Sequence, residues 1–182
     1  METYISILRG INVNGQKLIK MDALRKMYEH LGFQDVKSYV QSGNIIFSTQ
    51  KASPEVLANT ITEQIAKDFG FDVPIIVLTI DNLKQIIESN PLLKDNSIDT
   101  SFLHITFLAA TPQFFDREQI EEKKNDGEQI SFSDNAVYLY CPKGYGATKL
   151  SNSFLEKKLK VNATTRNWKT SNELLKIAQK TS

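Results

Sequence analysis

The chain has 182 residues, of which 41% are hydrophobic and 24% are charged, and its 22 basic and 21 acidic side chains nearly cancel. This composition is typical of one globular domain or two small ones and excludes disordered and fibrous proteins. One cysteine and two histidines exclude a disulfide framework and leave little for a metal site, so we expect neither a metal nor a cofactor. Without a signal peptide or an apolar segment of about 20 residues, we expect a cytoplasmic protein with no membrane contact.

The first 80 residues alternate between β-type runs and helical periodicity. Helical spacing begins at Met21 and stops at Gly32, and a second helix starts at Ser53-Pro54, an N-cap followed by proline, and ends at Gly70. The strands are expected at 4–8, 36–40, 45–48 and 74–78. The order βαββαβ predicts a split-βαβ, ferredoxin-like unit over residues 1–80.

A second series of elements follows a helical connector at residues 81–100. Its members are a strand at 102–108, an acidic helix from Thr111 to about Lys124, strands at 128–133 and 136–141, a helix at 150–159, and a last helix that a capping box opens at Thr170 to Glu173. Residues 101–182 therefore follow the order βαββα, with an extra C-terminal helix where a fourth strand would stand. We predict an α+β protein with two ferredoxin-like units.

The neutral total charge hides an uneven distribution along the chain. Residues 1–100 carry a net charge of −2, residues 101–141 carry −4 and residues 142–182 carry +7. A basic end of this kind is a possible footprint for phosphate or nucleic acid. The alternative is that these lysines form solvated helix faces and complement helix dipoles.

The topology of the first unit brings two polar segments together. In a split βαβ unit, the loop after the first strand and the hairpin between the second and third strands lie at the same end of the sheet. Arg9 and Asn12 should therefore lie beside Gln41, Ser42 and Asn44. These groups recognise ligands through hydrogen bonds but include no strong general base. The alternative is that they only form turns and cap backbone groups.

A glycine-containing loop precedes a helix in the second half. Gly144 and Gly146 would let backbone N–H groups approach an anion. Lys149 is predicted in the first helical turn, where a bound anion would offset its unfavourable position in the helix dipole. The spacing is not that of a Walker loop. The alternative is a tight connection between a strand and a helix.

The only tryptophan stands in a basic segment before the last helix. Arg166 and an exposed Trp168 would hold a phosphate and stack a base, and Asn167 lies between them. The alternative is that Trp168 anchors the helix while Arg166 and Asn167 bond to the backbone. Cys141 is expected to be a small packed residue, and His104 a packed or surface residue.

Five segments in this order make the sequence recognisable: LRGINVNG, MDALRKMYEHLGFQDVKSYVQSGNIIF, FGFDVPIIV, GYGATKL and TTRNWKT. Together they resemble the bacterial domain-of-unknown-function family 1697 over nearly the whole chain. The resemblance implies a two-part α+β structure with ferredoxin-like units and supplies no activity. The family's motifs RGIN, QSGN and TRNW correspond to Arg9–Asn12, Gln41–Asn44 and Thr165–Trp168. Asn14 stands where the family pattern has glycine, and asparagine tolerates positive φ better than most residues.

These observations favour a bacterial cytoplasmic binding domain for an anionic ligand, which would be a nucleotide or a nucleic acid. One alternative is an enzyme acting on a small phosphorylated or carboxylated metabolite, although no nucleophile–base pair is apparent. Another is a protein-interaction module that uses exposed sheet edges. The sequence determines neither the oligomeric state nor whether the three motifs form one site.

Overall fold

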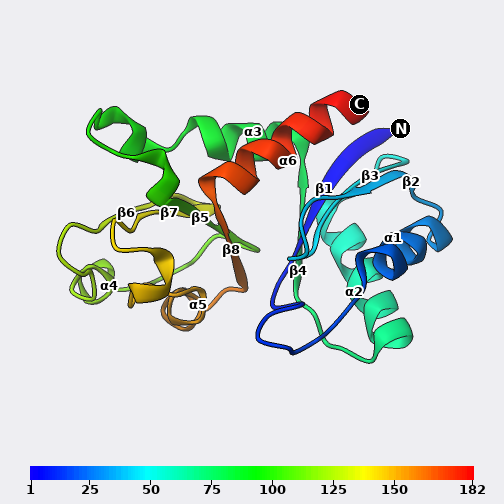
Figure 1. Cartoon of the computed structure of the whole chain (residues 1–182), viewed down its shortest axis with the longest axis horizontal. Coiled ribbons are helices and arrows are strands. Elements are labelled where there is room, and N and C mark those ends of the chain that lie inside the picture. Colours follow the sequence, from blue (N-terminus) through cyan, green and yellow to red (C-terminus); the bar gives the residue numbers. More distant parts are fainter. The chain divides into compact units, whose positions relative to one another are not determined.

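The computed structural model describes all 182 residues (Figure 1). Contacts within the chain divide it into two units, one formed by Met1–Lys84 with Glu173–Ser182 and the other by Gln85–Asn172. Each unit contains one four-stranded antiparallel sheet, and the order of the strands is the same in both. The predicted α+β class is confirmed.

The first unit contains the elements β1 (Glu2–Leu8), α1 (Met21–His30), β2 (Gln34–Ser38), β3 (Asn44–Thr49), α2 (Pro54–Phe69) and β4 (Ile75–Thr79). Its strand order is β2-β3-β1-β4. β1 pairs antiparallel with two strands, so Tyr4 lies opposite Phe47 on one side and Thr79 on the other. Because β3 lies between β1 and β2, the loop after β1 and the β2–β3 hairpin share one end of the sheet, as predicted.

An aromatic core lies between this sheet and the helices α1 and α2. Phe47 of β3 stacks on Phe33 with ring centroids 4.5 Å apart, and Tyr28 of α1 meets it edge-on at 5.4 Å. Tyr4 stacks on the same ring at 5.8 Å. Burying a side chain of this size stabilises a fold by about 1.5–3 kcal/mol. The buried Tyr28 hydroxyl is satisfied by Ser6 Oγ at 2.8 Å.

The two helices of the first unit begin differently. Ser53 caps α2 by accepting the N–H of Val56 at 3.2 Å, Pro54 occupies the first helical position, and Gly70 closes the helix with a φ of 73°. By contrast, the N-cap of α1 is Lys20, and no side chain caps that helix start. The first backbone N–H groups of α1 therefore lack a side-chain partner at its N-cap.

The second unit contains the elements β5 (Leu103–Leu108), α4 (Arg117–Glu121), β6 (Gln129–Phe132), β7 (Ala136–Tyr140), α5 (Asn152–Leu159) and β8 (Ala163–Asn167). The chain passes between the units within α3 (Ile80–Glu88) and α6 (Trp168–Thr181). Short 3-10 turns occur at η1 (Pro91–Lys94), η2 (Thr100–Phe102) and η3 (Tyr145–Ala147).

The fourth strand of the second unit is a difference from the sequence-based prediction, which places no strand there. β8 pairs antiparallel with β5, from His104 opposite Asn167 to Leu108 opposite Ala163. Its sequence, ATTRN, is short and polar and has no apolar alternation, since it lies at the edge of the sheet and is only partly buried. The segment forms a strand because its backbone pairs with β5, and its own sequence pattern does not predict this.

The predicted acidic helix from Thr111 to about Lys124 is wrong in its length. α4 has only five residues and begins after Asp116, whose Oδ1 accepts the N–H of Gln119 at 3.1 Å. Of these five residues only Ile120 is buried, so packing stabilises little more than one turn.

The last helix also begins earlier than predicted. α6 starts at Trp168, and the Oδ1 atom of Asn167 accepts the N–H of Thr170 at 2.8 Å. Asn167 is therefore the cap, and the capping box predicted at Thr170 to Glu173 is wrong.

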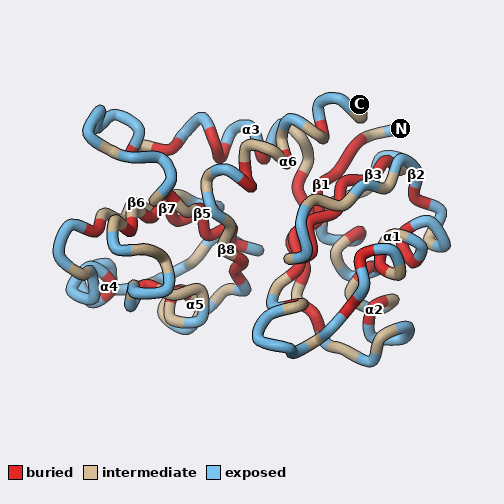
Figure 2. Tube along the Cα trace, viewed as in Figure 1, coloured by how far each residue is buried: buried red, intermediate tan, exposed pale blue.

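Burial follows the secondary structure in the first unit (Figure 2). β1 and β3 are buried along nearly their whole lengths, whereas residues 13–16 of the following loop are exposed. No helix of the chain combines the length and apolar character needed to cross a membrane.

Candidate functional site

The two polar segments of the first unit lie side by side, joined by Asn12. The Asn12 side-chain Nδ2 donates hydrogen bonds to the carbonyl oxygens of Ile19 at 2.9 Å and Gln41 at 2.8 Å, and its Oδ1 accepts the Ile19 N–H at 2.8 Å. The Leu8 N–H also donates to the Gly43 carbonyl at 2.8 Å. Asn12 therefore holds the loop after β1 against the β2–β3 hairpin.

The hairpin is stabilised by its own residues. Buried Asn44 donates from Nδ2 to the Tyr39 carbonyl at 3.0 Å and to Ser42 Oγ at 2.9 Å. Gly43 has a φ of 80°, and a Cβ there would lie 2.7 Å from Leu8 Cβ. Only glycine fits this position, because both its φ and the close approach exclude a side chain. The motif QSGN thus encodes a tight corner against β1.

These loops concentrate backbone strain. Asn12, Asn14, Lys17 and Val40 all have positive φ, between 45° and 55°. Asparagine, as at Asn12 and Asn14, tolerates this conformation better than most residues. A β-branched residue such as Val40 is rarely found there, and such conformations cost about 1–3 kcal/mol. The surrounding hydrogen bonds hold the loops in this shape.

A hollow of about 410 Å³, which we call the α1 hollow, opens beside these loops at the start of α1. It is lined by Lys20, Met21, Asp22, Arg25, Ser38, Val40 and Gln41. The Arg25 guanidinium extends from α1 and donates to Ser38 Oγ and Asp22 Oδ1. With two basic residues, one acidic residue and the uncapped start of α1, the hollow carries an excess of positive charge.

The α1 hollow contains one of the predicted site residues and two that the prediction missed. Gln41 lines it, whereas Arg9 does not, and the Arg9 N–H donates to the Pro74 carbonyl at 3.0 Å. Lys20 and Arg25 were not singled out because helix periodicity marks apolar positions. The one sequence feature that points to this hollow is the lack of an N-cap residue before Met21, which leaves the start of α1 uncapped.

The glycine loop of the second unit uses its own backbone groups. Gly144 has a φ of 90°, and its carbonyl accepts the N–H of Ala147 at 3.2 Å. The Thr148 N–H donates to the Tyr145 carbonyl at 3.3 Å. A Cβ at Gly146 would meet open space, so nothing in the fold requires glycine there.

Lys149 is exposed and lies before α5, not in its first turn as predicted, because α5 begins at Asn152. Ser151 caps this helix by accepting the N–H of Phe154 at 3.2 Å, and the Asn152 N–H donates to the Tyr145 hydroxyl at 2.8 Å. These two bonds satisfy N–H groups at the start of α5 without an anion.

The segment TRNW lies on β8 and at the start of α6. Arg166 is half-buried, and burial lowers the pKa of its guanidinium to about 10. Its Nη1 donates to the Thr165 carbonyl at 3.0 Å. Trp168 is half-buried, and Asn167 caps α6. These observations agree with the alternative in which Arg166 and Asn167 bond to the backbone. Contacts of these residues with a ligand stay a prediction.

A hydrogen-bonded network lies between α5 and the second sheet, with Asn152 at its centre. The Asn152 side chain accepts from Thr165 Oγ1 at 2.9 Å and donates to the Ala163 carbonyl at 2.9 Å and to Glu156 Oε1 at 3.2 Å. Thr165 Oγ1 also lies 2.8 Å from Thr106 Oγ1. The network joins strands β5 and β8 to the start of α5.

His104 and Cys141 are both packed within the second unit. The His104 ring stacks on Tyr145 with centroids 4.8 Å apart, and its buried Nδ1 has no hydrogen-bond partner. Burial lowers the pKa of His104 and raises the pKa of the buried Cys141 thiol to about 11. A protonated thiol is a weak nucleophile. No group of three or more His, Cys, Asp or Glu side chains is arranged to hold a metal ion.

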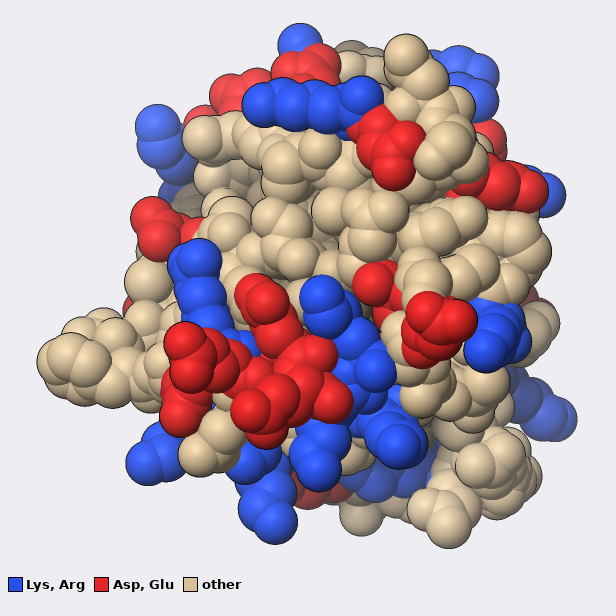
Figure 3. Space-filling model, turned by 90° about the vertical axis from the view of Figure 1, so that its left-hand side faces the viewer, with Lys and Arg blue, Asp and Glu red and all other residues tan.

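In the second unit, basic side chains from residues 142–172 lie near acidic side chains. Figure 3 shows acidic and basic side chains close together on the face that carries α4 and α5. Lys158 of α5 donates to Gln119 of acidic α4 at 3.2 Å. The basic block is therefore not a continuous basic surface on this face.

Comparison with known proteins supports the resemblance. The sequence model of a family described as "Protein of unknown function (DUF1697)" matches residues 1–138. The chain belongs to the DUF1697 family. No protein with a curated description matches this DUF1697 chain.

Among solved structures, the DUF1697 chain is similar to the conserved bacterial protein SP0830 from Streptococcus pneumoniae. The TM-score is 0.71 at 22% sequence identity, and the match covers 97% of this chain and 98% of that one. At this identity the similarity supports the fold.

Proposed function

We propose that this DUF1697 protein is a bacterial cytoplasmic binding protein that takes a phosphate-bearing ligand, a nucleotide or a nucleic acid, in the α1 hollow. The observation that carries the proposal is that Lys20 and Arg25 line one hollow at a helix start that no side chain caps. Backbone N–H groups at a helix N-terminus, together with nearby cations, are the usual elements of a phosphate site.

The charges within the α1 hollow favour Lys20 as the principal contact. Arg25 is already paired with Asp22, which lies three residues earlier on α1. Lys20 is exposed and forms no ion pair in the structure. At a helix N-terminus its charge is unfavourable by about 0.3–1 kcal/mol, and a bound anion offsets this cost.

The other lining residues favour a ligand with a base as well as a phosphate. Val40 is 50% exposed and offers an apolar wall, while the exposed Gln41 carries a carboxamide that both donates and accepts hydrogen bonds. The only hydroxyl is that of Ser38, which accepts from Arg25, and no imidazole or thiol lines the hollow. This chemistry supports recognition over the enzyme alternative.

The proposal is tested by fluorescence anisotropy with a labelled single-stranded RNA, and by calorimetry with ATP, both over a range of salt concentrations. We expect binding that strengthens at low salt, and a Lys20→Gln variant that weakens it several-fold. For RNA, losing one phosphate contact reduces the salt slope by about one. Binding of ATP alone identifies a nucleotide site, and binding of RNA alone identifies a nucleic-acid site.

A matched control is Lys26→Gln, because Lys26 is exposed on the same helix and does not line the hollow. Its affinity for either probe should equal that of the unmodified protein. The proposal fails if neither probe binds at low salt, or if Lys26→Gln weakens binding as much as Lys20→Gln.

A further inference from the structure

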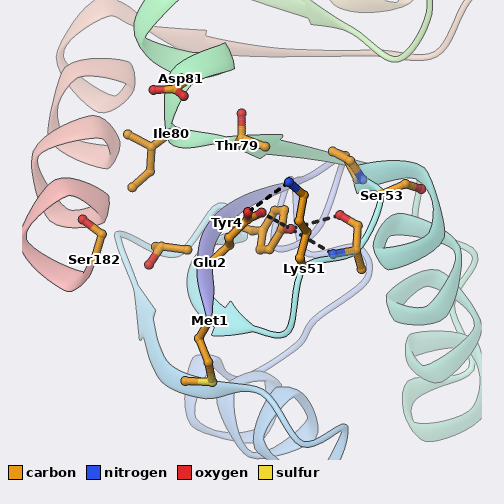
Figure 4. Close-up of a pocket in the computed structure, with 12 residues that line it drawn as sticks. Met1, Glu2, Tyr4, Lys51, Ser53, Thr79, Ile80, Asp81 and Ser182 are labelled. Carbon is orange, nitrogen blue, oxygen red and sulfur yellow. Dashed lines mark hydrogen bonds and ion pairs between the residues drawn. The ribbon is translucent and has the colours of Figure 1, made fainter.

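A larger cavity lies at the opposite end of the first sheet, where β1 begins (Figure 4). Its volume is about 960 Å³, and cavities of about 300–1,000 Å³ are typical of small-molecule sites. Its walls include the start of β1, the segment Lys51–Pro54 that leads into α2, Thr79–Asp81 where β4 leads into α3, and Ser182. None of the motif residues lines this cavity, which we call the β1 groove.

Tyr4 joins Glu2 and Ala52 at the β1 groove through its hydroxyl group. The Tyr4 hydroxyl lies 2.8 Å from Glu2 Oε2 and 3.0 Å from the Ala52 carbonyl oxygen, and it accepts the Ala52 N–H at 3.1 Å. The other Glu2 oxygen, Oε1, faces Lys51 Nζ at 3.7 Å. Both oxygens of Glu2 therefore have partners inside the protein.

Two helices begin at the β1 groove, and both starts are already capped. Ser53 accepts the N–H of Val56 at the start of α2, at 3.2 Å. Thr79 accepts the N–H of Asn82 at the start of α3, at 3.1 Å. Unlike α1, these helices do not present uncapped first turns, so the helix ends do not select an anion.

Besides Glu2, two charged side chains of opposite sign line the β1 groove. Asp81 is exposed and has no ion pair, and the side chain of Lys51 is 85% exposed with a single distant partner. Figure 4 shows Asp81 and Lys51 on different walls, with the Ile80 side chain beside Asp81. An apolar surface thus lies next to a carboxylate on one wall, and an ammonium group stands on another.

We propose that the β1 groove binds a small zwitterion of the amino-acid class. The ligand's ammonium group pairs with the Asp81 carboxylate, and its carboxylate pairs with the Lys51 ammonium. An aliphatic side chain of the ligand covers Ile80. This site is separate from the α1 hollow, so its existence does not depend on the function proposed above.

The test uses L-leucine as the probe, with two analogues that each lack one charge: 3-methylbutylamine has no carboxylate, and 4-methylpentanoate has no amine. Binding to the full chain is followed by NMR chemical shifts. We expect leucine to bind more tightly than either analogue, with shifts at Ile80 and Asp81. Asp81→Asn should weaken leucine binding about tenfold, as the loss of a charge-assisted contact does. Lys51→Gln should weaken it about threefold, because that pair is solvent-exposed.

The matched control is Asp126→Asn, which removes an exposed carboxylate from the second unit and should leave the leucine affinity unchanged. The proposal is overturned if leucine does not bind at millimolar concentration, or if Asp81→Asn and Asp126→Asn behave alike. It is also overturned if the amine or the carboxylate analogue binds as tightly as leucine. Asp81→Asn should leave ATP and RNA binding intact, which separates this result from the outcome at the α1 hollow.

Discussion

The two units of the chain share a strand order but differ in where they place polar groups and strain. The core between helices and sheet of the first unit is lined by aromatic rings around Phe47, whereas the second contains the hydrogen-bonded network around Asn152. Five non-glycine residues of the first unit have positive φ, whereas only Lys160 does so in the second.

This difference shows that the strand order can form without strained loops. Because the second unit forms the same strand order with relaxed loops, the strain around Asn12 and Val40 is not required to connect the strands. Strain that a fold does not need is found mainly where a loop has a task. The comparison therefore supports the choice of the first unit's loops for the proposed anion site.

The largest effect is expected from Phe47→Ala, which removes the ring at the centre of the aromatic core. Phe47 is fully buried, and truncation of such a side chain costs about 3–5 kcal/mol. Urea unfolding followed by circular dichroism measures this loss. Phe132→Ala, on half-buried β6 of the second unit, should cost clearly less, and equal losses would contradict the difference in burial between the two rings.

Asn152→Ala should have the next largest effect, because it removes the side-chain partner of the Ala163 carbonyl and one of the two partners of Thr165 Oγ1. Leaving a part-buried polar group unsatisfied costs up to about 1–3 kcal/mol. Asn12→Ala removes the same number of hydrogen bonds from a partly exposed loop, where water replaces them, and should cost less. If the free energies of unfolding show the opposite order, the network does not stabilise the second unit.

Val40→Gly should stabilise the chain by up to about 1 kcal/mol, since glycine removes the strain of a positive φ while increasing the entropy of the unfolded chain. Val36→Gly, at a half-buried position of β2 with ordinary φ, should instead destabilise it. Thermal unfolding of both variants checks the opposite signs. Destabilisation by both would show that the loop is not strained at Val40.

The smallest effect concerns the pH dependence of stability. Burial lowers the pKa of His104, so the unfolded state binds a proton before the folded state does. Stability is complete above the unfolded pKa of about 6.5 and falls as the pH drops below it. His104→Phe should reduce this slope between pH 7 and 5, whereas the exposed His30→Asn should keep it. An unchanged slope in His104→Phe would exclude His104 as the origin.

Several elements were predictable because local chemistry decides them. Ser53-Pro54 and Gly70 mark the ends of α2, and the order of strands in the first unit follows from its βαββαβ pattern. The contact between Asn12 and Gln41 follows from that topology as well. The role of the Asn12 side chain was not predictable. Whether a carboxamide binds the backbone or a ligand depends on the atoms that other segments bring close to it.

Two of the three errors have a common physical origin in tertiary contacts. β8 is a strand because β5 pairs with it, although ATTRN has little β-type pattern. Asn167 caps α6, although a capping-box match lies three residues later. α4 stops early because only Ile120 packs against the core. For β8 and α4, contacts with distant segments outweigh a local preference of a few tenths of a kcal/mol to about 1 kcal/mol, whereas at α6 one local cap competes with another.

By itself, the sequence determined the α+β class, the order of strands in the first unit and the meeting of its two polar segments, because periodicity, caps and turn residues act over a few neighbouring positions. Only the tertiary structure showed the α1 hollow and the β1 groove. Lys20 and Arg25 line one hollow with Gln41 because β2 and β3 bring the hairpin to α1. The β1 groove gathers Glu2, Lys51 and Asp81 from three separate segments. Both cavities are lined by residues that are distant in sequence, and patterns among neighbouring residues do not show which distant segments the fold brings together.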